Sequence, residues 1–435
     1  MTEGGFLAEL KWRGMLHQTS ATEAEVTAHL ASGSRTAYAG FDPTADSLHI
    51  GNFIPIKLLM HFQQAGHAPI ALMGGGTGLI GDPSGKDSER QMMTAEHTAA
   101  NVEGQRRVLE RFLDFSPSSK NRARLVNNAD WLAKLGFIEV LRDVGKHFSV
   151  NAMIQKDSVR ERLNNREQGI SYTEFSYMLL QAYDFLHLKR EHGCSVQMSG
   201  SDQFGNIAAG VDLIHRVYGR EGDAGAAYGI TAPLLTRSDG KKFGKSVEGA
   251  IYLSADRTSP YALYQFFVNV EDADVISLLK WYTFMPHEQI EAIAAAHAAA
   301  PERREAQREL ARAMTVTVHG KDELERVESA SQALFGGDVR ALDERTLGEV
   351  FADVPHSDHA IGTLDAPGHS LVELLPATTL AGSKREARQF LESGAIAVNG
   401  ERVGADHRLT RNDLLHGARI LLRRGKRQWH ATRWA

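Results

Sequence analysis

The stretch of residues 36–66 restricts the possible folds of this chain more than any other part. It begins with six mostly apolar residues that predict a strand, continues through a tight turn, and enters a helix expected to begin near His49 and end at Gly66. A helix N-terminus placed after a strand and a loop binds phosphate, because free N–H groups face the anion. His49 adds a donor there, and Gly51 lets a nucleotide approach the backbone. This pattern predicts a nucleotide site, although an ordinary strand–helix junction would look the same.

A second apolar strand is expected at residues 68–73, directly before a glycine-rich loop. Alternating strands and helices favour a doubly wound parallel sheet, in which ligands bind at the carboxyl ends of the strands. The loop lacks the spacing of a Walker P-loop. Lys86 and Arg90 could still pair with phosphate, and Asp82 could hold a cation or a substrate ammonium.

A helix is expected from Thr173 to about Leu188, opened by Ser171 as its capping residue. Tyr177, Gln181 and Asp184 follow one another at helical spacing and therefore point from one face. A face with a phenol, an amide and a carboxylate suits a polar binding pocket, because buried polar groups must be paired. A solvated outer face is the alternative.

Two further loops follow later strands. Asp202 comes after residues 194–198, which are expected to form a strand, and there it could accept from ribose hydroxyls or could cap the next helix. Residues 236–246 form a basic, glycine-containing loop with three lysines. Alone, such a loop could equally be a solvated surface segment.

Composition narrows the class of protein. The 435 residues suggest two or three domains, and the single Cys194 rules out an internal disulfide framework and a cysteine-rich zinc site. The N-terminus has no secretory signal pattern and no apolar run reaches membrane-spanning length, so we expect a cytoplasmic protein.

Charge is unevenly distributed along the chain. From His369 onward there are 12 Lys and Arg against 6 Asp and Glu, a net charge of +6. Because the whole chain has a net charge of −5, the residues before His369 carry −11. A basic tail on an acidic body suggests contact with nucleic acid, although a solvated basic face would have the same composition. Within it, a helix opened by Ser383 and a hairpin centred on Asn399-Gly400 are expected.

Several motifs in this order resemble class I aminoacyl-tRNA synthetases, and specifically the bacterial-type tyrosyl-tRNA synthetases. His49-Ile-Gly51-Asn52 is similar to the ATP-binding His-x-Gly-His motif, with Asn in place of the last His. Residues 242–246, Lys-Phe-Gly-Lys-Ser, resemble the lysine motif of the class. Residues 81–90 and the Tyr177-x-x-x-Gln181-x-x-Asp184 pattern resemble the tyrosine enzymes.

This resemblance implies an α/β architecture: a doubly wound, Rossmann-like catalytic domain, then a helical domain and a small α+β RNA-binding domain. The implied domains are 1–235, with a helical dimerisation insertion at about 115–165, a mobile lysine loop at 236–250, a helical anticodon-side domain at 251–353, a linker at 354–368 and an RNA-binding domain at 369–435. The implied activity is the activation of L-tyrosine with ATP and Mg²⁺, followed by transfer of tyrosine to tRNA(Tyr). A homodimer is also implied, whereas no protein-bound metal is expected.

The resemblance also assigns residues to roles. The implied catalytic residues are Thr44, His49, Asn52, Lys86, Arg90, Lys242, Lys245 and Ser246. The implied tyrosine-binding residues are Tyr38, Thr77, Asp82, Tyr177, Gln181, Asp184 and Gln197. The implied ATP-binding residues are Gly40, Asp42, Pro43, Thr44, His49, Gly51, Asn52, Asp202, Gln203, Lys242, Phe243, Gly244, Lys245 and Ser246. The implied RNA-binding residues are Lys384, Arg385 and Arg388.

Three rival functions fit parts of the sequence. A tryptophanyl-tRNA synthetase would share the fold, but an indole has no need of the Tyr38 and Asp184 pair. An RNA-scaffolding protein derived from a synthetase would not need the lysine loop. A small nucleotidyltransferase would not need the helical and RNA-binding domains.

Overall fold

The computed structural model describes residues 5–82, 93–156, 159–160, 163, 170–236, 243–246, 249–334, 339–352, 354–425 and 428–435. The chain divides into two compact units, residues 1–258 with 267–318, and residues 259–266 with 319–435. None of the helices in these ranges is long and apolar enough to cross a bilayer.

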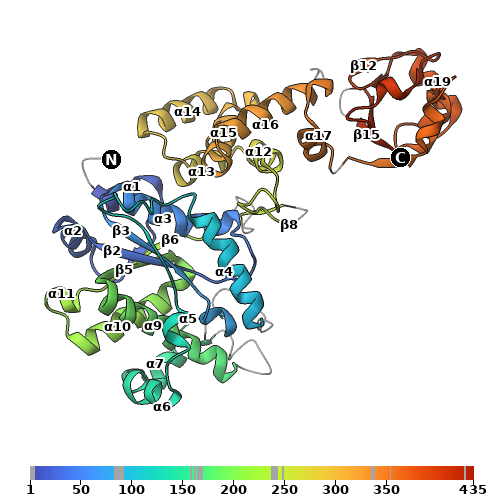
Figure 1. Ribbon diagram of the computed structural model, residues 1–435. Helices are drawn as coiled ribbons and strands as arrows, with labels where there is room; N and C mark the ends of the chain where they lie inside the picture. Colours follow the sequence, from blue (N-terminus) through green and yellow to red (C-terminus); the bar gives the residue numbers. More distant parts are fainter. Residues whose placement is uncertain are drawn as a thin grey trace. The chain divides into compact units, whose positions relative to one another are not determined.

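The first unit is built around a six-stranded sheet in the order β1-β6-β5-β2-β3-β4. The strands are β1 Gln18–Thr19, β2 Thr36–Phe41, β3 Ala68–Met73, β4 Arg124–Asn127, β5 Cys194–Gly200 and β6 Tyr228–Ala232. Neighbours pair in parallel from β6 to β4, and β1 adds an antiparallel edge. Figure 1 shows α3 (Phe53–Gln64) above this sheet, with α9 (Tyr172–His192) and α10 (Phe204–Tyr218) below it. Helices on both faces confirm the predicted doubly wound sheet.

The strand order reverses at β2, which pairs with β3 on one side and with β5 on the other. In doubly wound sheets, a crevice opens at the carboxyl ends of the two strands that flank such a reversal. Tyr38 of β2 is the register partner of Gln197 of β5, so these two side chains project from the same face of the sheet beside the crevice.

Local sequence explains where the helices around the crevice begin and end. A 3₁₀ turn, η1 (Ile50–Asn52), leads into α3, where Pro55 lies in the first turn and interrupts no intrahelical bond. The side chain of Ser171 accepts from the N–H of Glu174 at the start of α9, as its sequence predicts. Gly193 ends α9 with a φ of 62°, a left-handed conformation that glycine adopts without strain.

Residues 95–154 include part of the helical insertion expected at about 115–165, and within that insertion the structure has the strand β4. This four-residue strand extends the sheet by pairing with β3. Its sequence is short and alternates only weakly, so the strand depends on these backbone partners and could not be recognised from the sequence. The other elements of this region are α4 Ala95–Leu109, α5 Ala129–Leu132, α6 Phe137–Glu139, η3 Val140–Val144, η4 Gly145–His147 and α7 Val150–Ile154.

The region after residue 260, within the helical domain expected at 251–353, is mainly helical. Its helices are α12 Pro260–Val268, α13 Val275–Tyr282, α14 His287–Ala299, α15 Glu305–His319, α16 Lys321–Leu334 and α17 Glu344–Val350. The remaining helices of the first unit are α1 Gly5–Arg13, α2 Glu23–Ala31 and α11 Gly222–Gly225.

The second unit ends in a five-stranded sheet of order β12-β11-β14-β15-β9. Its elements are β9 His356–His359, β11 Ile396–Val398, β12 Glu401–Arg402, β14 Arg419–Arg424, β15 Gln428–Trp434 and the helix α19 Lys384–Glu392, with the short elements β10 His369–Ser370, β13 Arg408–Leu409 and α18 Leu371–Leu374 beside them. Val398 and Glu401 pair across Asn399 and Gly400, which both have positive φ, so the predicted hairpin is confirmed. Residues 354–368, expected as a linker, contain β9, whose backbone pairs in parallel with β15.

Candidate active site

The turn at His49 is organised by hydrogen bonds within its own four residues. The N–H of Gly51 donates to Nδ1 of His49 over 3.1 Å, and the N–H of His49 donates to Oδ1 of Asn52 over 3.1 Å. Because Nδ1 acts as the acceptor, the proton of a neutral imidazole sits on Nε2, which becomes a donor. A Cβ at Gly51 would lie 2.9 Å from the His49 ring, so a side chain there would force the imidazole to move.

The predicted lysine motif lies directly against this turn. Gly244 has a φ of 94°, and a Cβ there would lie 2.5 Å from Cγ2 of Ile50. The N–H of Ile50 donates to the carbonyl of Ile251 over 2.8 Å, and Leu253 donates to Leu48 over 2.8 Å. The structure therefore brings the two predicted nucleotide-binding segments together, although they are about 190 residues apart in sequence.

Some predicted residues of these segments are not described. Lys86, Arg90 and Lys242 lie outside the described residues. The backbone of Lys245 and Ser246 forms the short strand β7 (Lys245–Ser246), which pairs with β8 (Gly249–Ala250). Phe243 is buried.

Asp184 is the buried centre of the second part of the site. Its Oδ1 accepts from the indole N–H of Trp131 over 2.7 Å, and its Oδ2 accepts from Nδ2 of Asn128 over 2.9 Å. Burial raises the pKa of Asp184 to about 7, the two hydrogen bonds oppose this rise, and the charge of Asp42 adds to it.

Two buried polar atoms beside β2 and β5 have no hydrogen-bond partner among the described residues. They are the hydroxyl of Tyr38 and Oε1 of Gln197. Burial, with the nearby Asp184 charge, raises the pKa of Tyr38 well above its usual value, so its hydroxyl keeps its proton. Buried polar groups in native proteins are almost always paired. The side chains of Tyr38, Gln197 and Asp184, called the Asp184 corner below, are therefore suited to bind a polar ligand.

Asn128 joins Asp184 to the glycine-rich loop. Its Oδ1 accepts from the N–H of Gly76 over 2.7 Å, and its Nδ2 donates to Oγ1 of Thr77 over 3.0 Å. Thr77 in turn donates to Oδ1 of Asp42 over 3.3 Å. The loop is thus held against the corner by an amide side chain that the sequence did not single out.

Three of the other predicted residues, Asp82, Gln181 and Gln203, lie in a second polar network. Gln203 donates to Oδ2 of Asp82 over 2.6 Å, and Asn206 donates to Oε1 of Gln181 over 3.0 Å and to Oε1 of Gln203 over 3.3 Å. Tyr177, on the same helix as Gln181, donates to Oδ1 of Asp42 over 3.5 Å.

Asp202 lies in the 3₁₀ turn η5 (Ser201–Gln203) after β5, and Thr44 lies in the turn after β2. The residue at the N-cap of α10 is Gln203, so the alternative in which Asp202 caps this helix is wrong. Thr44 is exposed in the turn after β2, Asp42 and Pro43 directly precede it, and Gly40 lies within β2.

Sequence reasoning missed Asn128, Trp131 and Asn206. The first two follow β4, the strand that was not predicted. Had β4 been recognised, Asn128 would have been expected at the carboxyl end of a parallel strand, where site residues lie.

Comparisons with known proteins agree with this geometry. Residues 31–336 match the family described as "tRNA synthetases class I (W and Y)", and residues 346–432 match the "Tyrosine–tRNA ligase SYY-like C-terminal domain". The tyrosine–tRNA ligase of Roseiflexus castenholzii is 48% identical over 428 residues, which cover 98% of this chain and 99% of that protein. That of Geobacillus stearothermophilus is 49% identical over 433 residues, which cover 99% of each.

Solved structures are also similar. A C-terminally truncated mitochondrial tyrosyl-tRNA synthetase from Aspergillus nidulans has a TM-score of 0.68 and 32% identity, covering 76% of this chain and 94% of that chain. A tryptophanyl-tRNA synthetase from Encephalitozoon cuniculi bound to tryptophan has a TM-score of 0.53 and 14% identity, covering 73% of this chain and 87% of that chain. The second likeness shows a shared fold alone.

Proposed function

This chain belongs to the class I tRNA synthetases and is a tyrosine–tRNA ligase, and from that premise we propose how its residues perform the reaction. The enzyme joins tyrosine to ATP, giving tyrosyl-adenylate and pyrophosphate, and then transfers the tyrosyl group to the terminal ribose of tRNA(Tyr).

We propose that Asp184 and Tyr38 recognise the phenol of the substrate. The observation that carries this is the carboxylate of Asp184, fixed by Trp131 and Asn128, beside a Tyr38 hydroxyl without a partner among the described residues. The substrate hydroxyl would donate to Asp184 and pair with Tyr38. Phenylalanine would leave both groups buried and unpaired, which is costly.

The ammonium end of tyrosine would lie in the second polar network. Asp82, Tyr177 and Gln181 supply a carboxylate, a phenol and an amide oxygen, with Thr77 and Gln197 nearby. The existing contacts of Gln203 and Asn206 with this network hold Asp82 and Gln181 in place.

Activation needs no enzyme nucleophile, because the tyrosine carboxylate itself attacks the α-phosphorus. A carboxylate oxygen–phosphorus bond forms while the bond to pyrophosphate breaks, and pyrophosphate leaves with the electron pair. The protein aligns the two anions and stabilises the developing charge. Nε2 of His49 is the donor whose tautomer supports this role. Thr44, Lys86, Arg90, Lys242, Lys245 and Ser246 remain proposed partners of the phosphates.

Asn52, which stands where the related motif has a second His, would keep the turn in shape. Its Oδ1 caps His49, while its Nδ2 supplies donors toward the nucleotide. Asp202 and Gln203 would accept from the ribose. We propose that Mg²⁺ arrives with ATP, because its preferred ligands are phosphate and water oxygens.

A homodimer is proposed from an apolar surface between residues 137 and 172. Phe137, Ile138, Val150 and Tyr172 are 65%, 73%, 57% and 64% exposed. Large apolar side chains gathered on a surface mark interaction sites. These side chains belong to α6, α7 and the start of α9, and Figure 1 labels α6 and α7 at the lower edge of the first unit.

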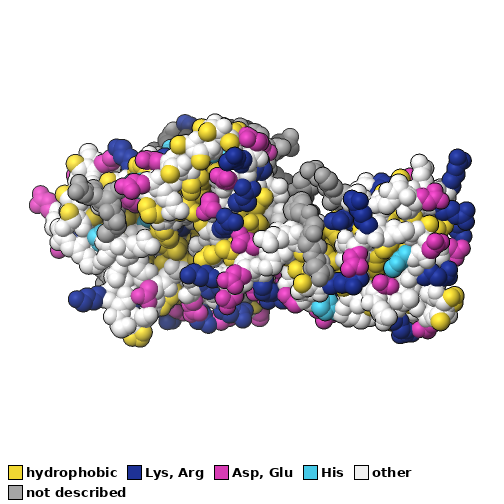
Figure 2. All heavy atoms as spheres, turned by 90° about the horizontal axis from the view of Figure 1, so that it is seen from above, with side chains coloured by type: hydrophobic (Ala, Val, Ile, Leu, Met, Phe, Trp, Pro, Cys, Tyr) yellow, Lys and Arg dark blue, Asp and Glu magenta, His cyan; other side chains and the backbone are white. Residues whose placement is uncertain are grey.

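The C-terminal domain is proposed to bind tRNA. Lys384, Arg385 and Arg388 are exposed on α19, and Lys384 pairs with Glu373 over 2.9 Å. Figure 2 shows dark-blue Lys and Arg side chains projecting from this domain at the right of the view. Such side chains suit a phosphate backbone. Since the reaction consumes ATP and charges tRNA, we also propose a cytoplasmic location.

The test of this function is ATP–pyrophosphate exchange by the purified wild-type protein, offered each amino acid in turn with Mg²⁺. We expect exchange with tyrosine and none with phenylalanine or tryptophan. Exchange with tryptophan would contradict the assignment of the Asp184 corner. Folded protein without exchange for any amino acid would contradict the proposed roles of the described residues.

A further inference from the structure

Tyr282, at the end of α13, contacts both nucleotide-binding segments at once. Its hydroxyl donates to the carbonyl of Ile50 over 3.1 Å, in the turn that carries His49. Its ring packs against Phe243 of the lysine motif, with centroids 6.0 Å apart, and stacks on Phe53 at 5.7 Å. Tyr282 is fully buried, and burial raises its pKa well above the usual value, so the hydroxyl remains a donor.

Three hydrogen bonds hold the backbone of Ile50 in place. Its N–H donates to Ile251, and its carbonyl accepts both the N–H of Phe53 and the hydroxyl of Tyr282. Because Ile50 follows His49 directly, a displacement of this carbonyl would move the imidazole donor. The Tyr282 bond is the one of these three that comes from outside the two motifs and their flanking residues.

The C-terminal end of α13 is fixed by Arg13 of α1. The guanidinium of Arg13 donates to the carbonyls of Lys280, Thr283 and Met285 over 2.9, 3.0 and 3.0 Å. Carbonyls at a helix C-terminus lack intrahelical partners, and a cation is favourable there. Tyr282 therefore projects from an anchored helix end.

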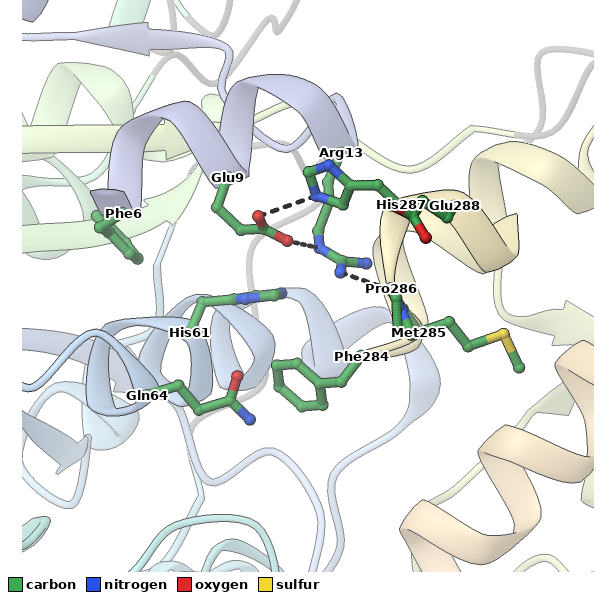
Figure 3. A pocket seen from close by; sticks show the side chains of 10 residues that line it. All are labelled: Phe6, Glu9, Arg13, His61, Gln64, Phe284, Met285, Pro286, His287 and Glu288. Carbon is green, nitrogen blue, oxygen red and sulfur yellow. Dashed lines mark hydrogen bonds and ion pairs between the residues drawn. The ribbon is translucent and has the colours of Figure 1, made fainter. Parts of the chain in front are cut away.

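Arg13 is itself held in a buried ion pair. Its Nε donates to Glu9 over 2.6 Å, and Glu9 also accepts from His287 over 3.0 Å. Figure 3 shows this group beside a cavity of about 420 Å³ whose lining includes His61 and Phe284. Because Glu9 and Arg13 belong to α1 and His287 begins α14, these hydrogen bonds connect the two helices.

We propose that Tyr282 is a positioning residue for tyrosine activation: it sets the His49 turn and the lysine motif relative to each other from α13. This rests on the proposed function of those two segments. The alternative is that Tyr282 only fills the core, in which case its hydroxyl would matter for stability and not for ATP.

The test compares Tyr282→Phe with Tyr228→Phe. The first keeps the ring and removes the hydroxyl bond to Ile50. The second removes a hydroxyl at the opposite, amino-terminal end of β6, away from both motifs. The measurements are kcat and KM for ATP and for tyrosine in pyrophosphate exchange, together with the melting temperature.

For Tyr282→Phe we expect kcat/KM for ATP to fall by about three- to tenfold, the range of one neutral hydrogen bond, mainly through kcat. KM for tyrosine should stay within about twofold, as one lost hydrogen bond at the ATP turn leaves the phenol pocket intact. Tyr228→Phe should match the wild type. Unchanged kcat and KM for ATP, or a lower kcat accompanied by a higher KM for tyrosine and a lower melting temperature, would overturn the proposal. Wild-type exchange with tyrosine in the same assay tests the proposed function separately.

Discussion

At the residue scale, single hydrogen bonds decide the chemistry of His49 and Asp184. A backbone N–H fixes the tautomer of His49, so the ring presents a donor without needing a positive charge. Two side-chain donors keep Asp184 an acceptor although burial favours its neutral form. Both side chains are prepared before substrate arrives, which lowers the reorganisation needed during the reaction.

The raised pKa of Asp184 predicts a pH dependence of tyrosine binding. Below a pKa of about 7 the carboxyl is protonated, and its new O–H conflicts with the donors of Trp131 and Asn128. Affinity for tyrosine should therefore be present above this pH and be lost as pH falls through it. If binding needs the carboxylate, the dissociation constant should rise about 20-fold between about pH 7.5 and about pH 5.5.

Titration calorimetry with tyrosine at several pH values measures this dependence. Asp184→Asn cannot titrate, so its weaker affinity should vary little over the same range. A wild-type dissociation constant that stays flat down to about pH 5.5 would contradict the role of the Asp184 carboxylate.

At the element scale, the sequence predicted those parts of the fold whose local pattern agrees with their environment. The β2–loop–α3 unit, α9 with its Ser171 cap, and the Asn399-Gly400 hairpin follow from spacing, capping and turn residues. β4 and β9 could not be predicted, because each is a four-residue strand that exists through pairing with a distant partner.

Site residues, too, could be predicted from the sequence only where a local pattern marks them. Tyr177, Gln181 and Asp184 were predicted because they share one helix face, and the two nucleotide motifs because each is contiguous. Asn128, Trp131 and Tyr282 act through contacts with residues at least 50 positions away in sequence. Nothing in their immediate neighbours marks them.

From the exposed apolar side chains of α6 and α7 we predict a dimer interface. A charge introduced into this interface should disrupt the dimer. Ile138→Asp should convert the dimer to monomers in sedimentation velocity, because the interface would have to bury an unpaired carboxylate. Tyr218→Asp, at a partly exposed apolar position at the end of α10, is the control and should leave the mass unchanged. A wild-type monomer, or an Ile138→Asp dimer, would contradict this interface.

At the scale of the whole molecule, the proposed roles assign tyrosine activation to the first unit and tRNA binding to the second. Residues 1–368 carry a net charge of −11, whereas the chain from residue 369 is basic. Pyrophosphate exchange does not involve tRNA, so the two activities can be measured separately.

Replacing Arg385 and Arg388 together by Gln should weaken tRNA binding and leave pyrophosphate exchange unchanged. If each contacts a phosphate, the slope of log affinity against log salt should fall by about 2. Arg220→Gln, which removes an exposed charge from the first unit, serves as the control. Filter binding over a salt series measures the slope, and an unchanged slope would place the RNA contact elsewhere.

The exchange kinetics of Asp184→Asn test whether the Asp184 carboxylate accepts a hydrogen bond from the substrate phenol. We predict that kcat/KM for tyrosine falls by about 10- to 100-fold, the range for a hydrogen bond to a buried charge. KM for ATP should stay within about twofold, because the proposed ATP site is at the His49 turn and not at Asp184. Asp223→Asn, whose side chain is 86% exposed, should behave as the wild type. Tyrosine kinetics unchanged in Asp184→Asn would contradict the account.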